Sequence, residues 1–500
     1  MDPTLEKLSA RVREVVDLRH AASILSWDER VYMPPGGSAA RGQALAAIQR
    51  LAHERFTSAD VGEWLEYAKA HADGSDAHSE ATAILAVTAR DYDKATRVPA
   101  SFVSELAVAT SAAQHAWRQA RAEADFSLFA PHLDTVFRLK RQYVAFFPST
   151  DHPYDALLDD YEPGMKTSEV QAIFAGIRPR QVALIRAIAE RPQVDDRLLR
   201  LPYSEPALWD FGVEVATAFG FDWTRGRQDT SPHPFTESSG AGDVRITTRF
   251  DPQEPFSTLW ATMHEAGHAL YEQGSDRRWT RTALEGGTSL AVHESQSRLW
   301  ENLVGRSRPF WEHFFPALQQ RFPAELGGAT LDEFYRSINR VQPSLIRVEA
   351  DEATYNLHVM LRVEMEIAML GGEVAVNDLP ELWNEQMREY LGIVPENAAQ
   401  GILQDVHWAD GLVGYFATYT LGNLISVQLW DAFQSVEPSR DDLMRHGDFS
   451  PLLSWLRREI HQHGRRYMPQ DLVRRVTGSG IDPEPYLQYL ERKYREIYGL

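Results

Sequence analysis

The stretch Ser257–Gln273, S-T-L-W-A-T-M-H-E-A-G-H-A-L-Y-E-Q, decides how this 500-residue chain is interpreted. A helix turns by about 100° per residue, so His264 and His268 project from one face about one turn apart. Two imidazoles in that arrangement can bind one tetrahedral metal ion. The apolar residues that can bury the rest of this helix are Leu259, Trp260, Met263 and Leu270.

Glu265 directly follows the first histidine, where its carboxylate can reach a water-filled coordination position and act as a general base. The pattern H-E-x-x-H also occurs on solvated helix faces, so a third ligand is needed to support a metal site. A metzincin would carry glycine at 271 and histidine at 274. This chain has Tyr271 and Gly274, which excludes that class.

A glutamate from a second helix is the other common third ligand. The segment Ser289–Val304, S-L-A-V-H-E-S-Q-S-R-L-W-E-N-L-V, has helical periodicity, and Glu294 lies off its apolar stripe. The turn-forming residues between the two helices allow them to be antiparallel. We therefore prefer Glu294 as the third ligand. The rival carboxylates are Glu272, Glu285 and Glu301.

A short strand is predicted just before the H-E-x-x-H helix. After a Gly-Ala-Gly turn, Val244, Ile246 and Thr248 alternate with Arg245, Thr247 and Arg249. A strand in this position can pair with an extended peptide substrate. A plain surface hairpin would give the same pattern, and the sequence leaves both interpretations open.

Composition limits the classes of partner. The net charge of −20 disfavours binding to nucleic acid or to an anionic membrane surface. The chain has no cysteine, so a metal site must use histidine and carboxylate ligands. The first residues lack the features of a secretory signal, so a cytoplasmic location is expected.

Most of the remaining sequence has helical periodicity, and we find no internal repeat. The segment Leu412–Trp430 contains no charged residue, but its polar side chains would be costly in lipid. A buried core helix beside a polar site is the preferred interpretation, and no membrane partner is expected.

Five motifs connect the chain to a known family. They are D-V-R-I-T at 243–247, H-E-A-G-H at 264–268, H-E-S-Q-S at 293–297, I-R-V-E-A-D at 346–351 and G-I-L-Q-D-V-H-W at 401–408. With these motifs in this order, the chain resembles the carboxypeptidase Taq family of metallocarboxypeptidases. The resemblance implies a mainly α fold: a large helical structure with a deep active-site cleft and a small β-sheet beside the H-E-x-x-H helix. Residues 1–500 would form a single catalytic domain, in which two helical lobes could flank the cleft.

The resemblance also implies an activity and a cofactor. The expected enzyme is a homodimer that releases single C-terminal amino acids from peptides with broad specificity. It would hold one Zn²⁺ per chain, with Co²⁺ as a substitute. His264, His268 and Glu294 carry over as the metal ligands, and Glu265 carries over as the catalytic base.

Further residues are candidates for contacts with the substrate. The donors that could stabilise the developing oxyanion are His407, Tyr415 and Tyr419, although the tyrosines could equally pack in the core. Arg347, and after it Arg245, could bind the terminal carboxylate of the substrate. The alternative for these arginines is an ion pair with a nearby acid, namely Glu349, Asp351 or Asp243.

Other polar residues receive weaker interpretations. A carboxylate should orient the ligand histidines, and the candidates are Asp351, Glu349 and Glu352. His293 could support a ligand or face solvent, and His233 could line the cleft. His461 and His463 are two residues apart and are predicted to lie on the surface.

Three competing functions remain. A metallo-oligopeptidase or dipeptidyl carboxypeptidase would cut short peptides with the same metal chemistry. A metalloaminopeptidase is disfavoured, because the chain lacks a G-x-M-E-N stretch to hold a free amine. A helical scaffold with an inactive site would have no use for Glu265.

Overall fold

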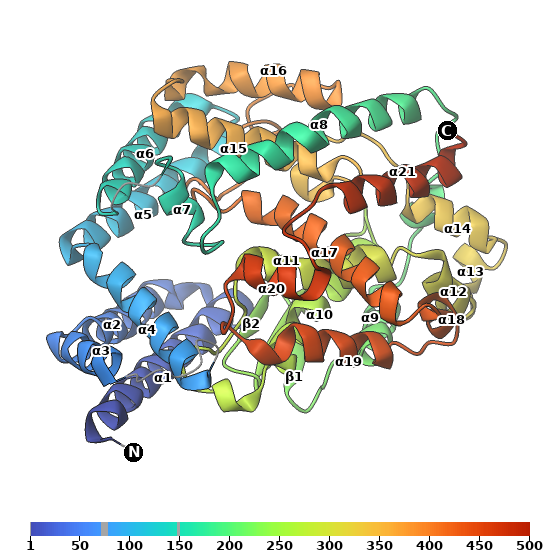
Figure 1. The fold of residues 1–500 in the computed structure, drawn as a ribbon. Helices are drawn as coiled ribbons and strands as arrows, with labels where there is room; N and C mark the ends of the chain where they lie inside the picture. Colours follow the sequence, from blue (N-terminus) through green and yellow to red (C-terminus); the bar gives the residue numbers. More distant parts are fainter. Residues whose placement is uncertain (1, 72–78, 148–150) are drawn as a thin grey trace.

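The computed structural model describes residues 2–71, 79–147 and 151–500, most of which are helical (Figure 1). The helices before the sheet are α1 (Pro3–Val31), α2 (Ser38–Phe56), α3 (Ala59–His71), α4 (Glu80–Arg97), α5 (Ala100–Glu123), α6 (Ala130–Ala145), α7 (Asp155–Leu158), α8 (Thr167–Ala189) and α9 (Glu205–Phe219). The helices after it are α10 (Ser257–Gly274), α11 (Leu290–Arg298), α12 (Arg308–Arg321), α13 (Pro323–Leu326), α14 (Leu331–Ile338), α15 (Tyr355–Gly371), α16 (Leu379–Leu391), α17 (Ala417–Val436), α18 (Arg440–Arg445), α19 (Ser450–Glu459), α20 (Pro469–Thr477) and α21 (Glu484–Tyr498).

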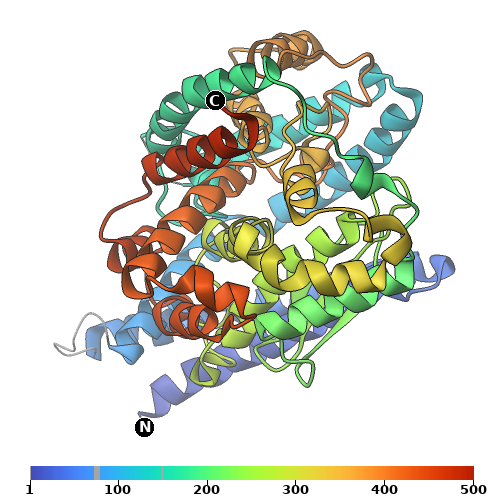
Figure 2. The same cartoon turned by 90° about the vertical axis from the view of Figure 1, so that its right-hand side faces the viewer.

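Shorter helical turns connect these elements. The 3₁₀ turns are η1 (Pro35–Gly37), η2 (Phe126–Leu128), η3 (Arg197–Arg200), η4 (Arg277–Trp279), η6 (Arg347–Glu349), η7 (Val376–Asp378) and η8 (His461–His463), and η5 (Leu299–Val304) is a π-helix. The C-terminal helix α21 packs beside α8 in both views (Figures 1 and 2). The predicted mainly helical fold is confirmed. The assignment of residues 1–500 to a single domain stays a prediction.

Helices α1–α4 form a group of their own, at the lower left of Figure 1. This N-terminal group has small separate cores, in which Val12 and Val16 of α1 pack with Val61 and Leu65 of α3. Helix α1 also contacts strand β2. The N-terminal group therefore lies against the sheet.

The sheet has three strands, β1 (Gly226–Thr230), β2 (Thr236–Ser238) and β3 (Val244–Thr248), in the order β1-β3-β2. Strand β3 is the predicted strand, and its residues Val244 and Ile246 are fully buried. It forms a hairpin with β2 but also pairs in parallel with β1, a partner that the sequence did not predict. The alternative of a plain surface hairpin is therefore wrong, because β3 is central and α10 packs against it.

The uncharged segment Leu412–Trp430 contributes most of α17, whose residues from 417 to 430 are buried with one partly exposed position. The predicted buried helix is thus confirmed. Among the described helices, not one combines the length and apolar character that a membrane crossing requires.

The prediction that His461 and His463 lie on the surface is wrong. Both are buried, because the tight turn η8 directs them inward instead of along a solvated helix face. The Nε2 atom of His461 donates to the side-chain oxygen of Gln296 at 2.9 Å. His463 accepts a hydrogen bond from Arg475 at 3.0 Å. Histidine spacing alone did not reveal these tertiary contacts.

Candidate metal centre

Helices α10 and α11 carry the predicted ligands and run antiparallel. His264 near the start of the α10 motif contacts Glu301, whereas Glu272 at its end contacts His293. The Ser289 hydroxyl caps α11 by accepting the N–H of Val292 at 3.1 Å. The helix predicted over 289–304 is present, but its last turn is the wider π-helix η5, a feature that is frequent at functional sites.

Two glycines allow the helices to approach closely. A Cβ at Gly267 would lie 2.6 Å from the Cα of Ser297, so α11 fits against α10 only because position 267 has no side chain. A Cβ at Gly422 of α17 would lie 2.6 Å from the Cγ of Glu294. The two glycines therefore leave the space in which Glu294 reaches the histidines.

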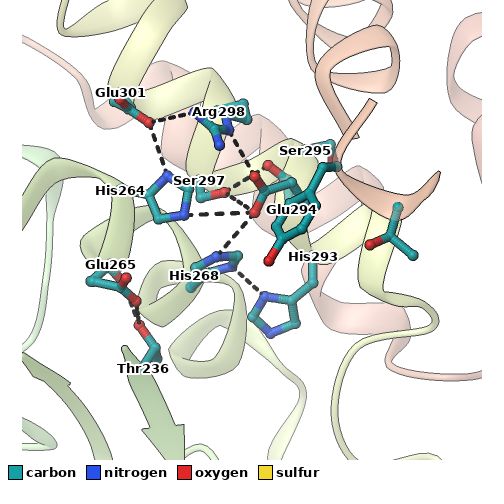
Figure 3. Close-up of polar contacts among 12 residues, drawn as sticks. Thr236, His264, Glu265, His268, His293, Glu294, Ser295, Ser297, Arg298 and Glu301 are labelled. Atoms are coloured by element: carbon teal, nitrogen blue, oxygen red, sulfur yellow. Dashed lines mark hydrogen bonds and ion pairs between the residues drawn. The ribbon is translucent and has the colours of Figure 1, made fainter. Parts of the chain in front are cut away.

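His264, His268 and Glu294 converge on one point (Figure 3). One ligand atom from each lies within 4.8 Å of the others. The Oε2 atom of Glu294 is 3.6 Å from Nε2 of His264 and 3.4 Å from Nε2 of His268. Two atoms that each bind a tetrahedral zinc at about 2.1 Å lie about 3.4 Å apart. The trio therefore fits a single ion of this size.

The other ring nitrogens have partners that orient the two imidazoles. Nδ1 of His264 donates to Glu301 at 2.9 Å. Nδ1 of His268 contacts Nδ1 of His293 at 2.6 Å, and Nε2 of His293 donates to Glu272 at 2.8 Å. With protons on both ligand Nδ1 atoms, each Nε2 keeps a lone pair toward Glu294, as metal binding requires.

The charges around the trio favour a carboxylate ligand. Burial acts to raise the pKa of Glu294, but Arg298 and the two histidines lower it well below its usual value. The Nε atom of Arg298 donates to Oε1 of Glu294 at 2.7 Å and leaves Oε2 facing the histidines. Burial lowers the pKa of His268 to about 4, so its ring is neutral at physiological pH.

The rival acids have other partners. Glu301 and Glu272 support the histidines from outside, and Glu285 lies in the loop before α11. The expectation that Asp351 orients a ligand histidine is wrong, because its carboxylate accepts backbone N–H groups of residues 342, 353 and 354. Glu352 instead pairs with Lys493 at 2.7 Å.

Glu265 lies on the opposite side of the histidine pair from Glu294, beside Thr236 of β2 (Figure 3). Its Oε2 atom accepts the Thr236 hydroxyl at 2.6 Å. Burial raises the pKa of Glu265, although the nearby His264 and the Thr236 hydrogen bond oppose this shift. A raised pKa makes this carboxylate a stronger proton acceptor.

His407, Tyr415 and Tyr419 gather on the His264 side of the trio. Nε2 of His407 lies 3.2 Å from the Tyr419 hydroxyl, and the rings of Tyr415 and Tyr419 are 5.4 Å apart. Tyr419 contacts the ring of Tyr355, over which the guanidinium of Arg298 lies at 4.4 Å. Through Tyr355, these aromatic residues therefore contact Arg298, which donates a hydrogen bond to Glu294.

The same three residues are neutral hydrogen-bonding groups. Burial raises the pKa of Tyr415 to about 12 and that of Tyr419 well above its usual value. Burial lowers the pKa of His407 to about 3. At physiological pH the two hydroxyls therefore keep their protons and the imidazole is uncharged.

Comparison with known proteins identifies the family of this chain. The sequence profile described as "Carboxypeptidase Taq (M32) metallopeptidase" matches residues 7–494. The chain belongs to the M32 family. Thermostable carboxypeptidase 1 of Thermus thermophilus is 41% identical over 97% of both chains, and carboxypeptidase 1 of Bacillus subtilis is 34% identical over 98% of this chain and 97% of its own. The crystal structure of the M32 carboxypeptidase of Deinococcus radiodurans R1 superposes with a TM-score of 0.97 at 39% identity, over 100% of both chains.

The protein is therefore an enzyme, a metallocarboxypeptidase, and the alternative of an inactive scaffold is wrong. Metal binding by M32 enzymes agrees with the fit of His264, His268 and Glu294 to one ion.

In this M32 carboxypeptidase, Arg347 pairs with neither Glu349 nor Asp351. Its Nη2 and Nε atoms donate to Asp405 at 2.7 and 3.2 Å, and its Nη1 donates to the Tyr355 hydroxyl at 2.8 Å. Arg362 donates to the same carboxylate at 2.6 Å. Two guanidinium groups thus share one carboxylate, and this buried cluster keeps a net positive charge.

Arg245 does not share the surroundings of the metal centre. It forms a two-pronged pair with Asp243 at 2.8 and 2.7 Å, which is the alternative that the sequence left open. Its guanidinium stacks on Trp27 of α1 at 4.4 Å. Side chains alternate along a strand, and Ile246 faces the core while Arg245 faces α1. Arg245 thus forms the ion pair with Asp243, and its role in substrate binding stays a prediction.

Several residues of this M32 site were not singled out from the sequence. They are Thr236, Arg298, Tyr355 and Asp405. Arg298 is four residues after Glu294 and Asp405 is two before His407, so local spacing could have drawn attention to both. Thr236 and Tyr355 reach the site through tertiary packing, for which we find no signal in the sequence.

Proposed function

We propose that this enzyme is a zinc-dependent carboxypeptidase that removes single C-terminal residues from peptides with broad specificity. The observation that supports this most strongly is the meeting of His264, His268 and Glu294 within 4.8 Å of one another, with Glu265 beside them. When bound, the zinc ion polarises the scissile carbonyl and lowers the pKa of its water. One Zn²⁺ per chain is proposed, and Co²⁺ could substitute for it.

Glu265 serves as the general base in this proposal. Its carboxylate takes the proton of the attacking water and passes it to the leaving amine. The Thr236 hydroxyl, 2.6 Å from Oε2, holds the carboxylate in place. Burial raises the pKa of Glu265, which favours the protonated form that passes the proton on.

Neutral donors on the His264 side stabilise the developing oxyanion. Tyr415 and Tyr419 keep their hydroxyl protons, since burial raises the pKa of each. His407 orients Tyr419 through the 3.2 Å contact between Nε2 and the hydroxyl. A preorganised donor of this kind typically contributes about a hundredfold or more in rate.

The substrate carboxylate is attracted by the positive cluster of Arg347 and Arg362 around Asp405. The Nε and Nη2 atoms of Arg347 already donate to Asp405. We therefore assign the attraction of the substrate carboxylate to the net charge of the cluster and not to a bidentate hydrogen bond from Arg347. Tyr355 and Tyr419 line this cluster, since Arg347 lies 4.9 Å from the Tyr419 ring. A single C-terminal residue would span from this cluster to the metal.

Product analysis tests the proposal. The zinc-loaded enzyme is incubated with a mixed set of peptides, with and without chelator, and the products are followed by mass spectrometry. Stepwise loss of single C-terminal residues that stops with chelator is expected. Internal fragments or released dipeptides would instead favour the metallo-oligopeptidase or dipeptidyl carboxypeptidase. Turnover that persists without metal would contradict both.

The resemblance to M32 carboxypeptidases also supports the proposal of a homodimer that acts on peptides in the cytoplasm. Light scattering of the purified protein tests the dimer, and a particle with the mass of a single chain would contradict it. Cell fractionation tests the location.

A further inference from the structure

A cavity of about 360 Å³ adjoins the candidate metal centre. Its wall includes Thr236 and His293, which hydrogen-bond Glu265 and His268 respectively. The opposite wall comes from α1 of the N-terminal group, including Val12 and Val16. A volume of this size matches the lower end of small-ligand sites.

The cavity lies on the His268 side of the metal centre. Because α10 and α11 are antiparallel, Glu272 and His293 lie beyond His268, whereas Arg298 and Glu301 lie toward His264. The positive cluster around Arg347 is connected to the His264 side through Tyr355. We expect a peptide whose carboxylate faces that cluster to extend its upstream residues toward the cavity. This step rests on the proposed function.

Three glutamates, Glu237, Glu272 and Glu285, line the cavity. Glu272 accepts a hydrogen bond from His293, which in turn contacts His268. Glu237 follows Thr236 on β2, and burial together with the charge of Glu272 raises the pKa of Glu237. The third glutamate, Glu285, comes from the loop before α11.

Glu285 has an unused acceptor atom. Its Oε2 accepts the backbone N–H of Arg281 at 2.9 Å and lies 3.4 Å from His20. Its Oε1 is buried and has no hydrogen-bond partner among the described residues. Gly240 has no side chain there, and a Cβ would lie 2.7 Å from this oxygen. Because this oxygen is buried, Glu285 acts on a ligand in the cavity through its negative charge and not by accepting a hydrogen bond at Oε1.

His20 and His293 of the wall contact Glu285 and Glu272, but the arginines of the wall do not pair with the three glutamates. Arg465 forms a two-pronged pair with Asp91 at 2.7 and 2.8 Å. Arg19 lies 5.5 Å from the ring of Phe56, on the part of the wall made by α1, α2 and α4. Outside the wall, the guanidinium of Arg30 lies 3.3 Å from Glu237. This single pair leaves the carboxylates of Glu272 and Glu285 without an ion pair to an arginine among the described residues. The part that adjoins the metal centre therefore remains acidic.

We propose that this cavity is a subsite for a cationic group of the peptide, upstream of the scissile bond. The group is an ammonium or guanidinium, from a lysine or arginine side chain or from the free N-terminus of a short peptide. It lies within the field of the three carboxylates of Glu237, Glu272 and Glu285. The enzyme thus binds the negative C-terminal carboxylate on one side of the metal centre and a positive group of the same peptide on the other side.

Matched peptides test this subsite with the zinc-loaded, full-length enzyme. Each peptide ends in the same C-terminal residue and carries lysine or norleucine at the second, third or fourth residue from that end, with a free or acetylated N-terminus. We expect lysine at one position, or the free N-terminus, to raise kcat/KM about tenfold, as for attraction between opposite charges in a partly buried site. The lysine and acetylation series distinguish the two sources of the cation.

Variants locate the preference in the cavity. Glu285→Gln should reduce the ratio of kcat/KM for the cationic and neutral peptides to near one, and Glu123→Gln, on an exposed stretch of α5, should leave the ratio unchanged. Glu237→Gln is the second variant if Glu285→Gln does not fold. Calorimetric binding of the same peptides to Glu265→Gln gives a readout that is independent of turnover.

The outcomes separate the inference from the proposed function. Equal kcat/KM for cationic and neutral peptides in the wild type would overturn the subsite. A preference that survives both Glu285→Gln and Glu237→Gln would also overturn it. If no peptide, including the neutral reference, lost its C-terminal residue, the proposed function itself would fail.

Discussion

The two sides of the candidate metal centre have opposite charge and different construction. On the His264 side, Arg347 and Arg362 share Asp405, and the buried Tyr355 lies between this positive cluster and Arg298. On the His268 side, Glu237, Glu272 and Glu285 line a cavity beside the N-terminal group. The metal centre thus lies between a positive side and a negative side, and the negative side adjoins a cavity. The difference indicates the direction in which a peptide lies across the metal.

Glu265 stands between the two sides, so its loss should affect all substrates alike. We expect Glu265→Gln to lower kcat by about a thousandfold, because the variant cannot accept the proton of the attacking water. Zinc content should stay unchanged, since Glu265 is not a ligand. Steady-state kinetics and metal analysis check both points. A loss of kcat that differed between cationic and neutral peptides would contradict the assignment of Glu265 as a general base for all substrates.

One buried glutamate lies behind each side of the centre. Glu366, behind the His264 side, accepts hydrogen bonds from Tyr154, Trp408 and the N–H of Gly414, and burial raises its pKa to about 7. Glu162, behind the His268 side, accepts the N–H of Ala291 at 3.3 Å, and burial likewise raises its pKa to about 7.

These raised pKa values predict a pH-dependent stability. Each group contributes stability that is fully present below pH 4.5, the ordinary pKa of glutamate, and is lost as the pH rises through about 7. Replacing Glu366 by glutamine should remove on the order of 3 kcal/mol of that pH dependence. Chemical unfolding of the metal-free wild type and Glu366→Gln between pH 4.5 and pH 8 measures the difference. An unchanged pH dependence would show that Glu366 is not protonated in the folded protein.

Arg347 tests whether the positive side acts by charge or by geometry. Arg347→Met should lower the preference for free over amidated C-termini by roughly thirtyfold, as for a lost interaction with a charged group. Arg347→Lys should retain most of the preference, because the net charge of the cluster is kept. The measurement is kcat/KM for pairs of peptides that differ only in a free or an amidated C-terminus, for the wild type and both variants. Equal losses in both variants would indicate a two-pronged grip instead.

The smallest expected effect concerns the space around Glu294. Gly422→Ala would place a methyl group 2.6 Å from the Cγ of Glu294, so the carboxylate must shift and zinc should bind about tenfold more weakly. The matched control is Gly176→Ala in α8, where nothing lies within 4 Å of the added Cβ. Competition titration with a zinc-binding dye measures both affinities. Equal affinities in the two variants would contradict the steric argument.

The sequence predicted the parts of the site that depend on local spacing. His264 and His268 are one helical turn apart whatever surrounds them, and the alternation of Val244 and Ile246 marks strand β3. The family motifs strengthened the choice of Glu294 as the partner from a second helix. The fold class followed from helical periodicity along most of the chain.

The rest depends on contacts between distant segments. Arg347 was expected to pair with acids in its own motif, but its partner Asp405 lies in another motif that α15 and its neighbouring loops bring alongside. His461 is buried because Gly274 and Gln296 leave it room between two helices. Strand β1 pairs in parallel with β3 across a chain reversal that periodicity does not encode. Local patterns cannot specify such tertiary partners.

The most direct test of the central claim is anomalous diffraction at the zinc edge from crystals of the zinc-loaded enzyme. We predict one strong peak per chain, about 2.1 Å from Nε2 of His264, Nε2 of His268 and Oε2 of Glu294. A peak coordinated by Glu301 or Glu272 in place of Glu294, or no peak between the two histidines, would contradict the account.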